Sequence, residues 1–124
     1  MQLSAGNQAV QILQNISFEV PAKQVLAIVG PSGSGKSTLL GLMAGLDRPT
    51  HGNIHIHGTN ITTLTEKAMA HFRRQHIGYV FQAFHLIPTL TAIENVALPL
   101  ELHGVPTGEE RAKTLLQAVG LEQR

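Results

Sequence analysis

The chain has 124 residues, a formal net charge of +1, 43% hydrophobic residues and 14% charged residues. This length suits one domain at most, and the apolar content argues against a disordered chain. The small net charge argues against a dedicated nucleic-acid binder, and the lack of cysteine excludes a disulfide scaffold, a thiolate zinc site and a cysteine nucleophile.

The first third of the sequence alternates between strand-like and helix-like patterns. Residues 10–20 alternate apolar and polar side chains, which predicts a half-buried strand. Residues 25–29 form a continuous apolar run, which is typical of a strand covered on both faces in a parallel sheet. A glycine-rich loop follows at residues 30–35, and residues 36–46 predict a helix that breaks at residues 48–52.

The middle of the sequence predicts a hairpin, a helix and a further strand. Residues 53–57 alternate again and end at Gly58, which indicates one strand of a hairpin. Thr63 and Glu66 have the spacing of a capping box, so we expect a helix from there to about Arg74. Residues 77–81 predict a strand, and residues 82–89 an irregular segment.

The last third of the sequence is helical in character. Two more capping-box patterns occur there: Thr91 with Glu94, and Thr107 with Glu110. Gly120 suits the C-terminal end of the last helix. Helical spacing predicts that this helix buries Ala112, Leu115, Leu116 and Val119.

The strongest functional signal lies between the apolar run and the first predicted helix. It fits the pattern G-x-x-x-x-G-K-[ST], with a strand pattern before it and a helix pattern after it. Glycines allow backbone torsions in which successive N–H groups point inward to cradle an anion, and the helix adds its positive dipole end. We therefore predict a phosphate-binding loop made of Gly30, Pro31, Ser32, Gly33, Ser34, Gly35, Lys36, Ser37 and Thr38.

Three side chains in this loop suggest specific contacts. Lys36 is a compact cation that can reach the outer phosphates of a nucleotide, and Ser37 can offer its hydroxyl oxygen to Mg²⁺. Thr38 is placed for a further phosphate contact. The loop does not define the reaction, because kinases, motor ATPases, GTPases and transport ATPases all contain it.

The loop and its flanks resemble the ATP-binding-cassette (ABC) ATPases along nearly the whole chain. The segments similar to that family are residues 16–20, 30–40, 45–52, 78–82 and 86–96. Residues 73–82 and 95–100 are most similar to the export subgroup, the lipoprotein-release and macrolide-efflux ATPases. The resemblance implies an α/β fold of the P-loop NTPase class. The chain would hold the antiparallel β-subdomain, part of the RecA-like core and the start of the helical subdomain.

The resemblance also implies a function. The chain would belong to the ATP-binding subunit of an exporter, cytoplasmic and peripheral on the inner face of the bacterial inner membrane, with ATP and Mg²⁺ as ligands. Gln82 would end the family's Q-loop strand at the γ-phosphate and metal, acting with Lys36 in catalysis and with Ser37 at the metal. Residues 83–103 would line the groove for the membrane permease's coupling helix. A second ABC domain would pair head to tail, and no nucleic acid is expected.

The sequence departs from the family pattern in two ways. Residues 1–9 hold no aromatic side chain to stack on adenine. The family's signature segment, its Asp-Glu strand (Walker B) and its switch histidine have no counterpart, and the only aspartate, Asp47, would cap the helix after the phosphate loop. We interpret residues 1–124 as the N-terminal part of a single ABC domain, which binds nucleotide weakly and hydrolyses it negligibly by itself.

Other readings of the sequence remain open. His51, His55 and His57 outline a metal site, although we favour the solvent face of a hairpin whose other face holds Ile54 and Ile56. The loop also suits a guanylate-kinase-like nucleotide kinase, which should continue into a substrate-binding segment where this sequence has a hairpin pattern. A non-transport ABC ATPase would carry coiled-coil or linker insertions, which this sequence lacks.

Overall fold

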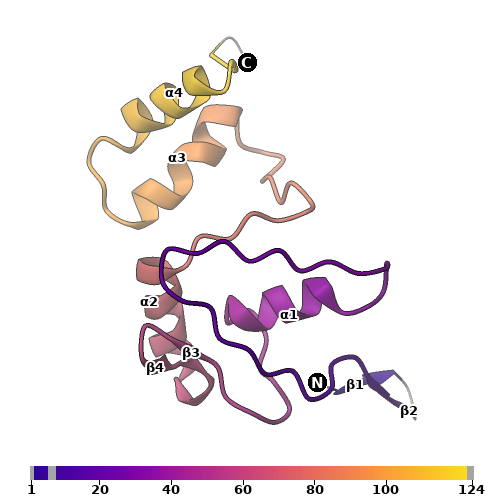
Figure 1. Ribbon diagram of the computed structural model, residues 1–124. Helices are drawn as coiled ribbons and strands as arrows, with labels where there is room; N and C mark the ends of the chain where they lie inside the picture. Colours follow the sequence, from indigo (N-terminus) through magenta and orange to yellow (C-terminus); the bar gives the residue numbers. More distant parts are fainter. Residues whose placement is uncertain (1, 6–7, 123–124) are drawn as a thin grey trace. The chain divides into compact units, whose positions relative to one another are not determined.

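The computed structural model describes residues 2–5 and 8–122, which form two compact units, Met1–Tyr79 and Val80–Arg124. Among the described residues no helix is long and apolar enough to cross a lipid bilayer. Figure 1 labels the elements. In chain order they are β1 (Gln2–Ala5), β2 (Gln8–Gln11), α1 (Lys36–Met43), β3 (His55–Ile56), β4 (Thr59–Asn60), the 3₁₀ turn η1 (Ile61–Thr63), α2 (Glu66–His76), α3 (Ala92–Leu102) and α4 (Gly108–Ala118).

Two of the predicted strands of the first unit do not form as expected. β2 pairs antiparallel with β1, so the strand predicted over residues 10–20 is wrong beyond Gln11. The strand predicted over residues 25–29 is also wrong, because Val25 is 99% exposed and Val29 is 88% exposed. A strand depends on hydrogen bonds to a neighbour, and no described segment pairs with this run. Figure 1 shows it as an unpaired segment in the same unit as α1.

Helix α1 ends earlier than the sequence predicts, because a glycine closes it. Gly45 has a φ of +63°, and its N–H donates to the Leu42 carbonyl at 3.0 Å. The Leu46 N–H donates to the Gly41 carbonyl at 2.9 Å, which completes a Schellman motif. Asp47 lies beyond this closure, so the expectation that it caps the helix is wrong.

The predicted hairpin is confirmed, with shorter strands. β3 pairs with β4 through a two-residue turn in which His57 and Gly58 both have positive φ, +49° and +76°. Such a turn matches the twist of the flanking strands. Ile54 and Ile56 pack toward the core while His55 is exposed, which confirms the solvent-face reading of the histidines. Within the described residues no three His, Asp or Glu side chains gather as a metal site.

Helix α2 begins at a different cap from the one predicted. The Thr65 hydroxyl oxygen accepts the Ala68 N–H at 3.3 Å, so the capping box predicted at Thr63 and Glu66 is wrong. Thr63 belongs to η1, where its hydroxyl donates to the Asn60 carbonyl at 3.1 Å. The Glu66 carboxylate instead pairs with Arg48 at 2.8 Å, on the exposed surface. The helix extends to His76, two residues past the predicted end.

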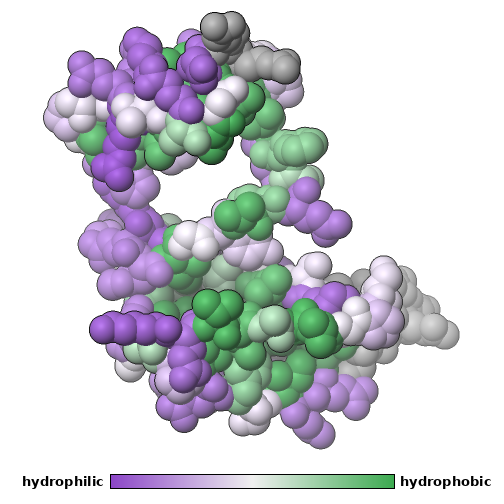
Figure 2. Space-filling view, turned by 45° about the horizontal axis from the view of Figure 1, so that its top comes forward, coloured by the Kyte–Doolittle hydropathy of each residue, from purple (hydrophilic) through white to green (hydrophobic). Residues whose placement is uncertain are grey.

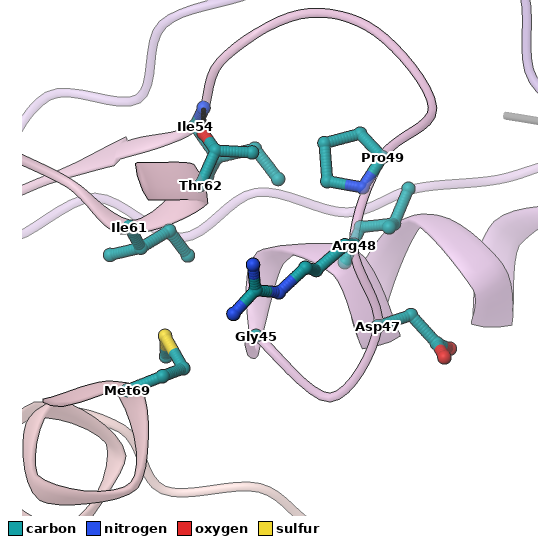
Figure 3. Close-up of a pocket in the computed structure, with 9 residues that line it drawn as sticks. Gly45, Asp47, Arg48, Pro49, Ile54, Ile61, Thr62 and Met69 are labelled. Carbon is teal, nitrogen blue, oxygen red and sulfur yellow. Dashed lines mark hydrogen bonds between the residues drawn. The ribbon is translucent and has the colours of Figure 1, made fainter. Parts of the chain in front are cut away.

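The core of the first unit joins the hairpin to α2. Ile61, Met69 and Phe72 are buried there, and the half-buried residues around them are Ile54, Ile56, Leu64 and Ile77. The end of α1 is held against this core, because Met69 lies against Gly45 and Arg73 donates to the Gly45 carbonyl. Figure 3 shows Met69 and Ile61 facing the turn that follows α1. The cavity between them is about 10 Å³, so it holds at most one water molecule and no ligand.

The second unit begins with an irregular segment and continues as a helical hairpin. The strand predicted over residues 77–81 is wrong, whereas the irregular segment at 82–89 is confirmed. The capping box of α3 is confirmed: the Thr91 N–H and hydroxyl each donate to the Glu94 carboxylate at 2.7 Å, and the Glu94 N–H donates back at 3.4 Å.

Helix α4 packs on α3 through small side chains. Ala97 and Ala112 are buried, and a Cβ on Gly108 would lie 3.3 Å from the Leu100 Cβ. Leu116 is buried as predicted, but Leu115 and Val119 are exposed because the stripe that faces α3 is narrow. Thr107 makes no side-chain capping bond, so the third capping box is wrong. Gly120 closes α4 with a φ of +72°, as predicted.

We expect Gly45→Ala to destabilise the first unit more than Gly58→Ala does. Both positions have positive φ, which costs an alanine ~1–2 kcal/mol. At Gly45 the new Cβ would also fall 2.2 Å from the Met69 Cε, whereas nothing lies within 4 Å at Gly58. Overpacking adds about 1–3 kcal/mol. Denaturant unfolding measures the free energy of unfolding of each variant. Equal losses of this free energy in the two variants would contradict the close contact between Gly45 and Met69.

The cap of α3 predicts a pH dependence. Hydrogen bonds from the Thr91 hydroxyl, and then from its backbone N–H, hold the pKa of the Glu94 carboxyl below its ordinary value. The cap therefore stabilises α3 above the ordinary carboxyl pKa and is lost as the pH falls through the lowered one. An NMR titration should show a lowered Glu94 pKa that rises in Thr91→Ala. An unchanged Glu94 pKa in that variant would count against the capping box.

Candidate functional site

The glycine-rich loop joins the exposed apolar run to the N-terminus of α1. Gly33 and Gly35 have φ values of +78° and +87°, in the region where only glycine is unstrained. The Ser34 N–H donates to the Pro31 carbonyl at 3.4 Å and closes a turn within the loop. The glycines predicted to permit unusual torsions therefore do so, and the loop is a defined turn.

Lys36 folds back over this loop. Its ammonium nitrogen donates to the Gly30 carbonyl at 3.0 Å, to the Pro31 carbonyl at 2.7 Å and to the Ser34 hydroxyl at 3.4 Å. The side chain thus joins both sides of the loop and brings a positive charge to it. An anion bound by the loop would meet this charge without a large movement of the lysine.

The first turn of α1 has no internal counter-charge. Its N-cap is Gly35, which offers no side-chain cap, and no acidic residue lies in the turn. Helices α2 and α3 differ, because each has a threonine cap and a glutamate in its first turn. The N–H groups of Lys36, Ser37 and Thr38 therefore start a helix whose positive dipole end is left for an external anion. The Ser37 side chain is exposed in this turn, and Thr38 is half-buried.

A close contact fixes the base of the loop. A Cβ at Gly35 would lie 2.7 Å from the Leu13 side chain and 3.3 Å from the Ile12 carbonyl oxygen. Gly35 is thus required by space as well as by torsion. Sequence reasoning missed this contact, because no pattern in the chain relates residues 12 and 13 to residue 35.

The remaining predicted site residues lie in the second unit. Gln82 is exposed in the irregular segment before α3, so its approach to the phosphate loop and to a metal stays a prediction. The predicted permease groove, residues 83–103, carries several exposed apolar side chains: Phe84 at 90%, Leu102 at 72% and Leu86 at 64%. In Figure 2, hydrophobic residues are coloured green, and they form part of the exposed surface on the visible face of the molecule. Of residues 1–9, where no adenine-stacking aromatic occurs, residues 1, 6 and 7 lie outside the described part.

Comparison with known proteins gives consistent matches over nearly the whole chain. Residues 13–124 match the family model described as "ABC transporter". The chain is 47% identical over 118 residues to a lipoprotein-releasing system ATP-binding protein, LolD, of Bacteroides fragilis, covering 94% of this chain and 55% of that protein. It is 43% identical to the macrolide export ATP-binding/permease protein MacB of Shigella sonnei, covering 97% of this chain and 19% of that protein.

A solved structure gives the same result at the level of the fold. The dimeric ATP-binding cassette MJ0796 in a post-hydrolysis state, bound to ADP and Pi, has a TM-score of 0.84 with 41% identity. The match covers 94% of this chain and 51% of that one. The chain thus has a P-loop NTPase fold of the cassette type, and it spans about half the length of most of these relatives.

Proposed function

The chain belongs to the ABC transporter family, and from this membership we propose that it is the nucleotide-binding part of an exporter's ATP-binding subunit. The whole subunit would couple ATP binding and hydrolysis to export across the bacterial inner membrane. The observation that carries the proposal is the loop from Gly30 to Thr38, which ends at the uncapped first turn of α1. The names of the LolD and MacB relatives support the export subgroup.

The phosphate loop would bind the nucleotide through its own groups. Backbone N–H groups from Gly33 to Thr38 would donate to the phosphates, and Lys36 would exchange its loop carbonyls for phosphate oxygens. Ser37 and Gln82 would hold Mg²⁺, which neutralises phosphate charge when bound. The oxygen ligands that these two side chains offer suit that hard cation.

The second unit would contact the permease. Gln82 would sense the γ-phosphate, and its neutral amide both donates and accepts, so it can enter or leave a charged site at little cost. The segment that follows, residues 83–103, would face the coupling helix, in keeping with its exposed apolar side chains. A second cassette would pair head to tail, and the dimeric state of the MJ0796 cassette supports this pairing.

These 124 residues lack a carboxylate suited to hydrolysis. Asp47 follows the end of α1 on an exposed turn, and it does not end an apolar strand as the family's Asp-Glu pair does. In a subunit as long as the relatives, we propose that strands from the remaining half pair with residues 25–29 and supply this group. The exposed Val25 and Val29 are the surface that such strands would cover.

The subunit would be peripheral on the cytoplasmic face of the inner membrane, held there by the permease. The family match argues against a guanylate-kinase-like enzyme, whose mark would be phosphorylation of GMP. A non-transport ABC ATPase remains the competing reading. Co-purification of the full-length subunit with a membrane permease distinguishes the two, because only the transport reading expects it.

We expect Lys36→Ala to weaken Mg-ATP binding about 10- to 100-fold, because a hydrogen bond to a charged group contributes ~1.5–3 kcal/mol. Lys67→Ala is the matched control, since it removes the same charge from an exposed position of α2. Isothermal titration of each variant with Mg-ATP gives the two affinities. Equal Mg-ATP affinities for the two variants would show that Lys36 does not bind the nucleotide, and would refute the proposed role of the loop.

We also expect a polypeptide of these 124 residues to hydrolyse Mg-ATP no faster than the Lys36→Ala background. The reason is that it offers Lys36, Ser37 and Gln82 but no base to orient water. Phosphate release measures the rate. A turnover that Lys36→Ala abolishes would show that these three residues suffice for hydrolysis, and would refute this expectation.

A further inference from the structure

Asn95, near the start of α3, makes an unusual number of hydrogen bonds for one side chain. Its amide oxygen accepts the Ile87 N–H at 2.8 Å. Its amide nitrogen lies 3.2 Å from the Ile87 carbonyl oxygen, 3.0 Å from that of Leu90 and 2.9 Å from that of Thr91. An asparagine amide has two N–H donors and one carbonyl acceptor, so both of its ends are used.

These bonds do not serve to cap the helix. Thr91 and Glu94 already form the capping box of α3, with reciprocal bonds that leave Asn95 out. Asn95 instead reaches back to Ile87, eight residues earlier. It therefore fixes the backbone of residues 87–91 to the first turn of α3, together with the bond from the Leu90 N–H to the Ile87 carbonyl at 3.1 Å.

The segment before this anchor is bent at residues 82 and 83. The ring centroids of Phe81 and His85 lie 4.5 Å apart in an edge-on contact, and His85 has a φ of +48°. Phe84 lies between these two rings in sequence and is 90% exposed, and Leu86 just after His85 is 64% exposed. Gln82 lies in the same bent segment. The apolar side chains thus stand between a ring contact on one side and the Asn95 anchor on the other.

We propose that Asn95 is a positioning residue that presents Phe84 and Leu86 to the permease. The inference rests on the proposed function, in which residues 83–103 contact the permease. An exposed aromatic ring binds a partner more tightly when its backbone is already ordered, because less conformational entropy is lost on docking. Asn95 holds the backbone of Ile87 to α3. A shift of Gln82 at the nucleotide would therefore move Phe84 relative to the fixed backbone of Ile87.

The structural part of the proposal is tested by hydrogen exchange in the full-length subunit. Asn95→Ala removes the acceptor of the Ile87 N–H and all the donors, whereas Asn95→Asp keeps an acceptor and loses only the donors. We expect the Ile87 amide to exchange slowest in the parent, faster in Asn95→Asp and at least tenfold faster in Asn95→Ala. Thr91→Ala is the control, because it breaks the cap but leaves the Asn95 bonds to backbone atoms in place.

The functional part is tested on the subunit assembled with its permease. The measured quantity is the ratio of ATPase rates with and without the permease. We expect Asn95→Ala and Phe84→Ala to lower this ratio several-fold. Leu116→Ala, which removes a buried side chain of α4 outside residues 83–103, should leave it near the parent value at a temperature well below its melting point.

The outcomes separate the two proposals. If Phe84→Ala lowers the ratio while Asn95→Ala does not, the contact exists and the positioning role of Asn95 is refuted. If Leu116→Ala lowers the ratio as much as Asn95→Ala, the effect is general loss of helix stability, and the inference also fails. If the permease changes the rate of no form, including the parent, then the proposed function itself fails.

Discussion

The geometry of the candidate site depends on the close packing of α1 at both of its ends. At the first end Gly35 lies against Ile12 and Leu13, and at the other Gly45 lies against Met69. Neither position has room for a side chain, and both have positive φ. The helix is therefore held at both ends by close backbone approach, in addition to its buried Leu42 side chain. Because the glycine-rich loop continues directly into α1, these contacts also fix where the N–H groups of the loop point.

The turn of the glycine-rich loop and the helices could be predicted because their determinants are local. The Gly-Lys-Ser pattern specifies a turn and a helix start within a few residues, and the Thr91–Glu94 capping box needs only its own four residues. The same local reasoning failed at Thr63, where η1 intervenes and Thr65 caps α2 instead. Only Thr63 has the capping-box spacing to Glu66, but η1 takes up Thr63 and leaves Thr65 to cap α2.

The strand predictions at residues 12–20, 25–29 and 77–81 failed for the opposite reason. A run such as residues 25–29 has the composition of a buried strand, but a strand exists only where a neighbour completes its hydrogen bonds. The Asn95 anchor was missed because no spacing rule relates an asparagine to a carbonyl eight residues earlier. The contact of Gly35 with Leu13 is likewise a product of the fold. In each case the missing information is the position of a distant segment.

The exposed apolar run at residues 25–29 also bears on the order of events during synthesis. In a subunit about twice this length, ribosomes adding ~5–20 residues per second would need roughly 6–25 s to make the second half. Throughout that interval Val25 and Val29 would face the solvent or a chaperone. The nascent chain would be most prone to association in this window, before the strands proposed for the remaining half can pair with residues 25–29. The glycine-rich loop and α1 would therefore form early, and the partners of the apolar run would be made late.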